Sequence, residues 1–251
     1  MDLTAHTDCC GRANRRAGAM KPRRSLRLRL RLGVGAACLG LAVAAGAATP
    51  RGQQIADTSR GVGKPACISC HGPSGQGLAD AGFPRLAGLP AAYLGRQLRS
   101  FDDGTRISPV MTPIAKGLSA ADRLAVATYF ASLPVTEVVV RSAAPAATPA
   151  LIAAGAAIAQ NGKWSAYVPA CAQCHGAQGF GVGDTFPQIA GQSATYIANQ
   201  LQAWRRGTRK DDPMGLMHGI ALRLSEPDVN AVAAYYASLP ATAETAPGAK
   251  P

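Results

Sequence analysis

One five-residue pattern, Cys-x-x-Cys-His, occurs twice in this chain and brings two reactive thiols and a metal-binding imidazole close together. The copies are Cys67-Ile-Ser-Cys70-His71 and Cys171-Ala-Gln-Cys174-His175. Two thiols three residues apart lie on one helical turn, where they can add to the two vinyl groups on one edge of a porphyrin. The His that follows can then coordinate the iron. The pattern therefore predicts two covalently bound haem c groups, one for each copy.

Other uses of paired cysteines fit this spacing less well. A zinc ribbon places its second pair about 15–20 residues after the first, whereas Cys171 follows Cys67 by 104 residues. A thioredoxin-like redox pair requires strands that alternate with helices, and structural disulfides would not require a His after each pair. Zinc, redox and disulfide interpretations are therefore disfavoured.

The other axial ligand of each iron is expected to be a methionine. After residue 48, the candidates are Met111 in the first half of the chain and Met214, Met217 and His218 in the second. Met111 and Met217 each stand eight residues before a serine, Ser119 or Ser225, so the repeat pairs Met217 with Met111 and leaves Met214 and His218 as alternatives. Ligation by His and Met saturates the iron, which favours electron transfer over chemistry at the metal.

These motifs and ligands together give the predicted haem-binding set. Its members are Cys67, Cys70, His71, Met111, Cys171, Cys174, His175 and Met217, of which His71, Met111, His175 and Met217 are the iron ligands. No catalytic residue is predicted.

The elements that position these residues form an internal repeat. The matching segments are 70–77 and 174–181, 83–88 and 186–191, 104–106 and 207–209, and 129–134 and 235–240. The offset is 103 residues in the middle of each half and 106 after it, which indicates a three-residue insertion near Lys210–Asp212. We expect domains at 49–137 and 151–242, a linker rich in Ala and Pro at 138–150, and a flexible tail at 243–251.

Each half is expected to be helical, with no convincing strand pattern. Ser119 and Ser225 are good N-caps for helices that cover 120–132 and end before Pro240, respectively. The segments 90–102 and 193–206 predict one more helix in each half. The first of the capped helices is expected to bury Leu124, Ala127, Tyr129, Phe130 and Ala131.

Other repeated residues have expected roles near the haems. The carbonyl group of a loop at Pro84 or Pro187 could accept a hydrogen bond from the free ring nitrogen of each ligating His. Arg106 and Arg209 could pair with haem propionates or lie in solvent. Tyr93 and Tyr196 could be core residues or donors toward the haem pocket.

Residues 1–48 predict an N-terminal extension and a secretory signal peptide. Lys21 and five arginines up to Arg31 precede an apolar run from Gly33 to Ala48, which predicts translation from Met20 and cleavage near Ala47 or Ala48. The run has 16 residues, fewer than the roughly 20 that span a bilayer, so a retained anchor is the less favoured alternative. Export and haem attachment indicate a bacterial periplasm.

Charge argues against a nucleic-acid partner. The chain has a formal net charge of +12, but nine of its 26 basic residues and two of its 14 acidic residues lie before Thr49. The remaining chain carries a net charge of +5, so the high isoelectric point mainly reflects the signal.

The motifs, the Phe-Pro-x-(Leu/Ile)-Ala-Gly loops and the Tyr-(Phe/Tyr)-Ala-Ser-Leu-Pro tails resemble the diheme cytochrome c4 family. The resemblance covers nearly all of residues 55–241. It implies an all-α fold of two tandem class I cytochrome c domains, related by approximate two-fold symmetry, with the haem edges facing each other.

The main functional hypothesis is a periplasmic electron carrier, a monomer and not an enzyme. Its partners would be a quinol-oxidising membrane complex or a dehydrogenase as donor and a terminal oxidase as acceptor, with peripheral membrane association left open. The alternative is the cytochrome subunit of a heterodimeric (flavo)dehydrogenase. A diheme peroxidase is disfavoured, because it needs an open axial site on one iron.

Overall fold

The computed structural model describes residues 50–59, 64–135 and 147–242, all within one compact unit. These residues are helical, with a few isolated β-bridges and no named strand among them. The expected all-α fold is therefore confirmed. The predictions for the signal segment, for linker residues 138–146 and for the tail lie outside the described residues.

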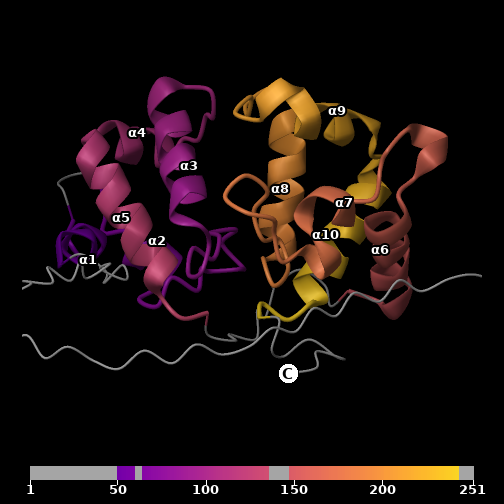
Figure 1. The fold of residues 1–251 in the computed structure, drawn as a ribbon, viewed down its shortest axis with the longest axis horizontal. Helices are drawn as coiled ribbons and strands as arrows, with labels where there is room; N and C mark the ends of the chain where they lie inside the picture. The colour runs from indigo at the N-terminus through magenta and orange to yellow at the C-terminus, as the bar shows by residue number, and fades with distance from the viewer. Residues whose placement is uncertain (1–49, 60–63, 136–146, 243–251) are drawn as a thin grey trace, which may run out of the picture. The chain divides into compact units, whose positions relative to one another are not determined.

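The described residues of the first half form five helices, shown from indigo to magenta in Figure 1. They are α1 Pro50–Asp57, α2 Ile68–His71, α3 Ala91–Asp103, α4 Met111–Lys116 and α5 Ala120–Ser132.

The second half repeats this order with three additional 3-10 turns, labelled η. Its elements are α6 Pro149–Asn161, η1 Trp164–Ala166, α7 Ala172–His175, η2 Ala177–Gly179, α8 Ala194–Arg205, η3 Pro213–Gly215, α9 Leu216–Arg223 and α10 Glu226–Ser238. Helix α6 starts inside the predicted linker, because the Thr148 side chain accepts a hydrogen bond from the Leu151 N–H and Pro149 suits the first helical position. No helix in the described ranges combines the length and the apolar character needed to cross a bilayer.

Serine caps start the last helix of each half, as predicted. The Ser119 side chain accepts a hydrogen bond from the Asp122 N–H, and the Ser225 side chain accepts one from the Asp228 N–H. At Ser225 the Asp228 carboxylate also accepts from the Ser225 N–H, which completes a capping box. These caps satisfy backbone donors that the helix leaves unpaired and so fix where α5 and α10 begin.

The buried face of α5 differs from the prediction at one position. Leu124 is 63% exposed, whereas Val126 and Phe130 are each 3% exposed. Ala127 and Tyr129 are buried as expected, and Ala131 is half-buried. The helix turns Leu124 outward because Val126 and Phe130, one turn apart, occupy the core-facing stripe.

Close approach between the first and last helix defines each half. A side chain at Gly52 of α1 would collide with the Ala125 carbonyl oxygen of α5, and one at Gly155 of α6 would collide with the Ala231 carbonyl oxygen of α10. Only glycine allows the two backbones to come this near. Both halves therefore have the same crossing of terminal helices.

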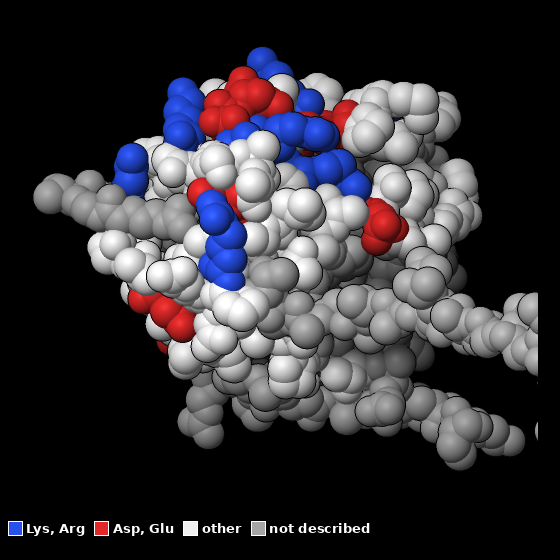
Figure 2. Space-filling model, turned by 60° about the vertical axis from the view of Figure 1, so that its left-hand side comes forward, with Lys and Arg blue, Asp and Glu red and all other residues white. Residues whose placement is uncertain are grey.

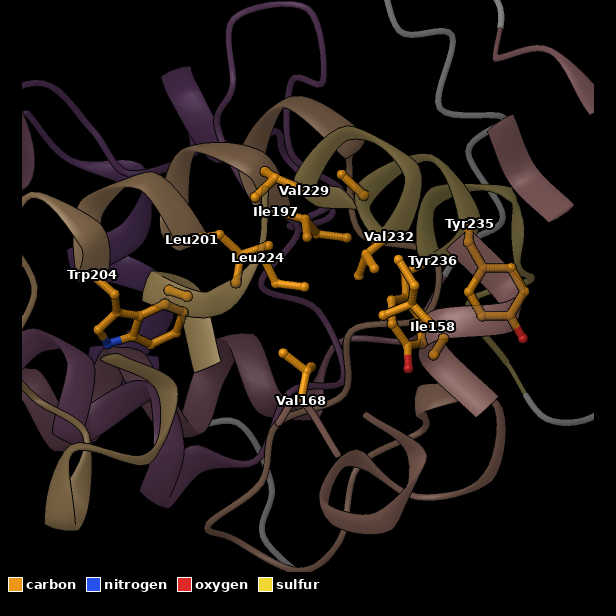
Figure 3. Packing of buried hydrophobic residues seen from close by; sticks show 13 residues of the cluster. Ile158, Val168, Ile197, Leu201, Trp204, Leu224, Val229, Val232, Tyr235 and Tyr236 are labelled. Carbon is orange, nitrogen blue, oxygen red and sulfur yellow. The ribbon is translucent and has the colours of Figure 1, made fainter. Parts of the chain in front are cut away.

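Each half has its own hydrophobic cluster. The cluster of the first half includes Ile55, Leu94 and Phe130. In the second half, Figure 3 shows the cluster as a row of side chains with Trp204 at one end and Tyr235 at the other. Leu201, Leu224 and Tyr236 of this cluster also line a cavity, so the core forms one wall of the site.

Candidate haem centres

The two short helices α2 and α7 hold the Cys-x-x-Cys-His motifs in the same conformation. The Cys70 N–H donates to the Cys67 carbonyl at 3.2 Å, and the Cys174 N–H donates to the Cys171 carbonyl at 3.2 Å. Each pair of thiols therefore lies on one tight turn. All four cysteines and both motif histidines line one cavity, as thioether formation with a haem in each half requires.

Both motif histidines are buried and held by a proline carbonyl. The Nδ1 atom of His71 lies 2.9 Å from the Pro84 carbonyl oxygen, and that of His175 lies 2.8 Å from the Pro187 carbonyl oxygen. The predicted hydrogen bonds are therefore confirmed. They fix each ring and leave its Nε2 atom available to a metal.

The electrostatic environment keeps these imidazoles neutral. Burial lowers the pKa of His71 and His175 below the usual value and outweighs the hydrogen bond to the proline carbonyl, which raises the pKa. A neutral imidazole is the form that binds iron. Both histidines therefore suit an axial position.

The cavity that these residues share has a volume of about 1050 Å³. This exceeds the usual range for a pocket that holds one small molecule, about 300–1,000 Å³. It also contains two buried donors, Arg85 Nε and Trp204 Nε1, that have no hydrogen-bond partner among the described residues. A large apolar cavity with buried unsatisfied donors fits haem groups, whose propionates are acceptors.

The candidate methionines have different surroundings. Met111 is the first residue of α4, is half-buried and lines the cavity. Met217 lies at the start of α9, lines the cavity and packs against the core of the second half. Met214 also borders the cavity, but it is 90% exposed, has a positive φ of 58° and does not pack against the core. The structure therefore gives Met217, rather than Met214, the same environment as Met111.

His218 is exposed and outside the cavity lining. Its Nδ1 atom lies 2.9 Å from the Trp204 carbonyl oxygen, and its backbone N–H donates to Asp212. Both contacts fix His218 on the outer side of α9. The structure therefore does not place His218 among the residues that line the cavity with Met111 and Met217.

Arg106 and Arg209 are buried, so the alternative prediction that they lie in solvent is wrong. They are 6% and 4% exposed, and the backbone bridge between them joins the two halves: Ile107 N–H donates to Thr208 O, and Lys210 N–H donates to Thr105 O, both at 2.7 Å.

The side chains of this bridge form a nearly symmetric network. The Oε1 atoms of Gln97 and Gln200 each accept hydrogen bonds from both arginines, at 2.6–3.1 Å. Arg106 also donates to the Tyr196 hydroxyl at 2.8 Å, and Arg209 interacts with the buried Tyr93. The two tyrosines thus serve the contact between halves as well as the pocket wall.

Several residues of this region were not given roles by the sequence. Gln97 and Gln200 recur in the repeat, and that recurrence is the signal that could have identified them. Arg85, Asp211 and Gln192 have no equivalent of the same type in the other half. Gln192 joins the halves by accepting from the Arg85 N–H at 3.0 Å and donating to its carbonyl at 3.1 Å.

Comparisons with known proteins agree with this geometry. The model of the cytochrome c family matches residues 50–134 and 152–240. The chain is 46% identical over 184 residues to a thiosulfate dehydrogenase electron acceptor of Thiomonas intermedia, which covers 73% of this chain and 83% of the relative. It is 37% identical over 203 residues to cytochrome c4 of Pseudomonas aeruginosa, covering 80% and 92%.

Two solved structures are also similar. Reduced cytochrome c4 from Pseudomonas stutzeri aligns with a TM-score of 0.64 and 32% identity, over 78% of this chain and 100% of that one. A thiosulfate dehydrogenase, TsdBA, from Marichromatium purpuratum aligns with a TM-score of 0.69 and 40% identity, over 76% of this chain. This chain spans only 40% of the length of that dehydrogenase.

Proposed function

This chain belongs to the cytochrome c family, in the diheme cytochrome c4 group, and we propose that it accepts electrons from a thiosulfate-oxidising dehydrogenase in the periplasm. It binds two covalent haem c groups and is an electron-transfer protein rather than an enzyme.

In each half the same residue types would hold the haem. Cys67 and Cys70 would form the thioethers of the first haem, with His71 and Met111 as axial ligands. The corresponding residues of the second are Cys171, Cys174, His175 and Met217. A haem with both axial positions filled supplies one-electron transfer and offers no site for a substrate.

One observation carries this proposal: both halves repeat a buried His held by a proline carbonyl and a cavity-lining Met at the start of a helix. A peroxidase would need one half to lack the Met. The repetition therefore supports two equivalent electron-transfer centres. We place the first domain at 49–137 and the second, beginning with α6, at about 149–242.

The electron donor is proposed from the relatives. Two proteins of 46% identity are named thiosulfate dehydrogenase electron acceptors, from Thiomonas intermedia and Stutzerimonas stutzeri. Oxidation of thiosulfate by the donor would deliver one electron to each haem, and a terminal oxidase would remove them. A periplasmic location follows from the export signal expected in residues 1–48.

The surface supports a partner contact that salt affects only moderately. Figure 2 shows one face on which the charged side chains gather mainly toward one edge, while uncharged side chains cover much of the rest. The chain after residue 48 has a modest net charge of +5. Screening acts mainly on exposed charges, so we expect the uncharged part of such a face to limit the salt dependence.

A stable complex with a dehydrogenase is the second candidate. It is favoured by the TsdBA structure, in which the part similar to this chain is 40% of a longer chain. Size-exclusion chromatography of the two native proteins distinguishes the candidates: co-elution supports a subunit, and separate elution supports a free carrier.

Rapid-mixing spectroscopy tests the donor. The oxidised holo-protein is mixed with thiosulfate and a catalytic amount of a thiosulfate dehydrogenase, and the haem absorbance is followed. We expect full reduction of both haems with enzyme and none with thiosulfate alone. A protein that dithionite reduces but the enzyme and thiosulfate do not would overturn the proposed donor, and reduction by quinol-oxidising membranes would then indicate the other partner.

A further inference from the structure

The two halves share their proposed iron ligands but differ in buried charge. Arg106 and Arg209 are equivalent in the repeat, whereas Arg85 corresponds to Gln188, and Asp211 comes from the segment inserted in the second half. All five residues line the cavity. The buried charges that the two halves contribute to the cavity wall are therefore unequal.

Asp211 places a carboxylate in the second half. Its side chain is 3% exposed, and its Oδ1 atom accepts a hydrogen bond from Arg209 Nε at 2.8 Å. Its Oδ2 atom is buried and has no hydrogen-bond partner among the described residues. Asp211 thus neutralises Arg209 and leaves one carboxylate oxygen without a donor in the cavity wall.

In the first half, no carboxylate of the described residues neutralises Arg106, the equivalent of Arg209. Arg106 donates to Gln97, Tyr196 and Gln200, all neutral, and no ion pair of Arg106 occurs within residues 50–59, 64–135 and 147–242. The Arg106 guanidinium lies over the Phe101 ring, 4.5 Å from its centroid. In the second half, the equivalent Arg209 lies over the Trp204 ring, 4.0 Å from its centroid.

Arg85 adds a second buried cation to the first half. It is 4% exposed and donates to the carbonyl oxygens of Ala87 and Ala190. Burial lowers the pKa of Arg85 to about 10, so it remains protonated at neutral pH. It directly follows Pro84, which holds His71. The equivalent Gln188 is neutral and donates to the same Ala190 carbonyl.

A buried charge shifts the reduction potential of a nearby haem. Reduction lowers the charge at the iron by one, so a nearby cation favours the reduced state and a nearby anion favours the oxidised state. Exposed charges count less, because solvent and salt screen them. This applies to Asp103 and Arg206, which occupy equivalent exposed positions with opposite signs.

We propose that Asp211 lowers the reduction potential of the second haem, while Arg85 raises that of the first. The buried charges therefore bias the first electron toward the first haem. This inference rests on the proposed function, because it takes the haems to be held by the two motifs with His and Met as ligands. Asp211 and Arg85 act on the haems through their charge and do not bind the iron.

Asp211→Asn is the direct test, because the amide oxygen can still accept from Arg209 Nε while the charge is lost. The holo-protein is titrated spectroelectrochemically, with the haem methyl NMR signals assigned to each domain. At a fixed potential we expect the ratio of reduced to oxidised second haem to rise at least about threefold, or about 28 mV at 59 mV per decade. The first haem should shift less.

Two further variants complete the design. Asp184→Asn removes an exposed acid of the second half and should leave both potentials unchanged. Arg85→Gln copies the residue of the second half and should lower the first haem's ratio of reduced to oxidised form by about threefold. It tests the same principle independently, should Asp211→Asn fail to fold.

The outcomes separate the inference from the proposed function. Suppose that the wild-type protein has two haems with Met ligation at both. If neither Asp211→Asn nor Arg85→Gln then shifts a reduction potential in the expected direction, the inference alone is overturned. Wild-type protein with fewer than two haems, or without Met ligation at one of them, overturns both. In Asp211→Asn, a rise that is larger at the second haem than at the first supports the inference, and an equal rise at both haems overturns it.

Discussion

The first and second halves of this protein have the same chemistry in different surroundings. Both hold a motif His with a proline carbonyl, and both have a Met in the first turn of a short helix, Met111 in α4 and Met217 in α9. The second half also has the buried Asp211, which has no equivalent in the first half.

A hydroxyl group adds another difference. The Tyr236 side chain hydrogen-bonds to Cys171, and burial raises the pKa of the Cys171 thiol despite this bond. The equivalent residue of the first half, Phe130, has no hydroxyl. The comparison shows that the repeat retains the residues that would bind haem while the atoms around them diverge, so the two sites can differ in potential without a change of ligand.

The largest expected effect comes from loss of one motif. Replacing Cys67 and Cys70 with Ala should lower the intact mass by one haem, and the same change at Cys171 and Cys174 should also remove one. The domain that loses its haem should lose much of its helical signal in circular dichroism, because the haem fills its cavity. Two retained haems in either variant would contradict the assignment.

Loss of a distal ligand should have the next largest effect. Met217→Ala should abolish sulfur ligation at the second haem and Met111→Ala at the first, each seen as a change in the optical spectrum of the ferric protein. Met214→Ala is the matched control, because Met214 is 90% exposed, and should leave the spectrum unchanged. The opposite pattern for Met214 and Met217 would show that Met214 is the ligand.

The helix crossings should respond equally in the two halves. Gly52→Ala and Gly155→Ala would each press a methyl group against a carbonyl oxygen of the facing helix, and should destabilise the protein by about 1–3 kcal/mol in chemical denaturation. Gly95→Ala in α3 meets open space and should stabilise it by about 0.5–1 kcal/mol. Equal effects at all three positions would argue against the close crossings.

The helix caps should have smaller and similar effects. Ser119→Ala and Ser225→Ala should each cost about 1 kcal/mol, because each removes the hydroxyl oxygen that accepts from an N–H of the first turn. In Ser225→Ala the backbone N–H of residue 225 keeps its bond to the Asp228 carboxylate, so the second bond of the capping box remains. Denaturant midpoints of the two variants measure both losses. No loss of stability in either variant would be inconsistent with the structure.

The pH dependence near Asp228 should be the smallest effect. Burial raises the pKa of Asp228, but hydrogen bonds from Lys163 and Ser225 lower this pKa by more than burial raises it. The pKa therefore lies below the usual value. The charged carboxylate therefore stabilises the fold above the unfolded pKa of about 3.9, and this stabilisation is lost as pH falls through the folded value. In Asp228→Asn, the melting temperature should depend less on pH in this acidic range than in wild type.

Much of the fold followed from local patterns in the sequence. Ser119 and Ser225 mark the starts of α5 and α10, and the repeat located α3, α8 and the proline carbonyls, because caps and repeated loops act through neighbouring residues. The exposure of Leu124 was predicted wrongly, because several apolar residues in α5 compete for one buried stripe.

Contacts between the halves could not be predicted. The burial of Arg106 and Arg209 depends on Gln97 and Gln200, which lie about 100 residues apart in sequence. A single sequence shows that these residues recur but not that they meet. The role of Asp211 likewise depends on where the inserted segment folds.

Proton NMR of the reduced native protein tests directly whether both irons have a methionine ligand. A methionine bound to haem iron has side-chain resonances shifted far upfield by the haem ring current. We expect two such sets, assigned to Met111 and Met217, in a protein whose mass shows two haems. One set, no set, or a set assigned to Met214 would contradict two equivalent electron-transfer centres.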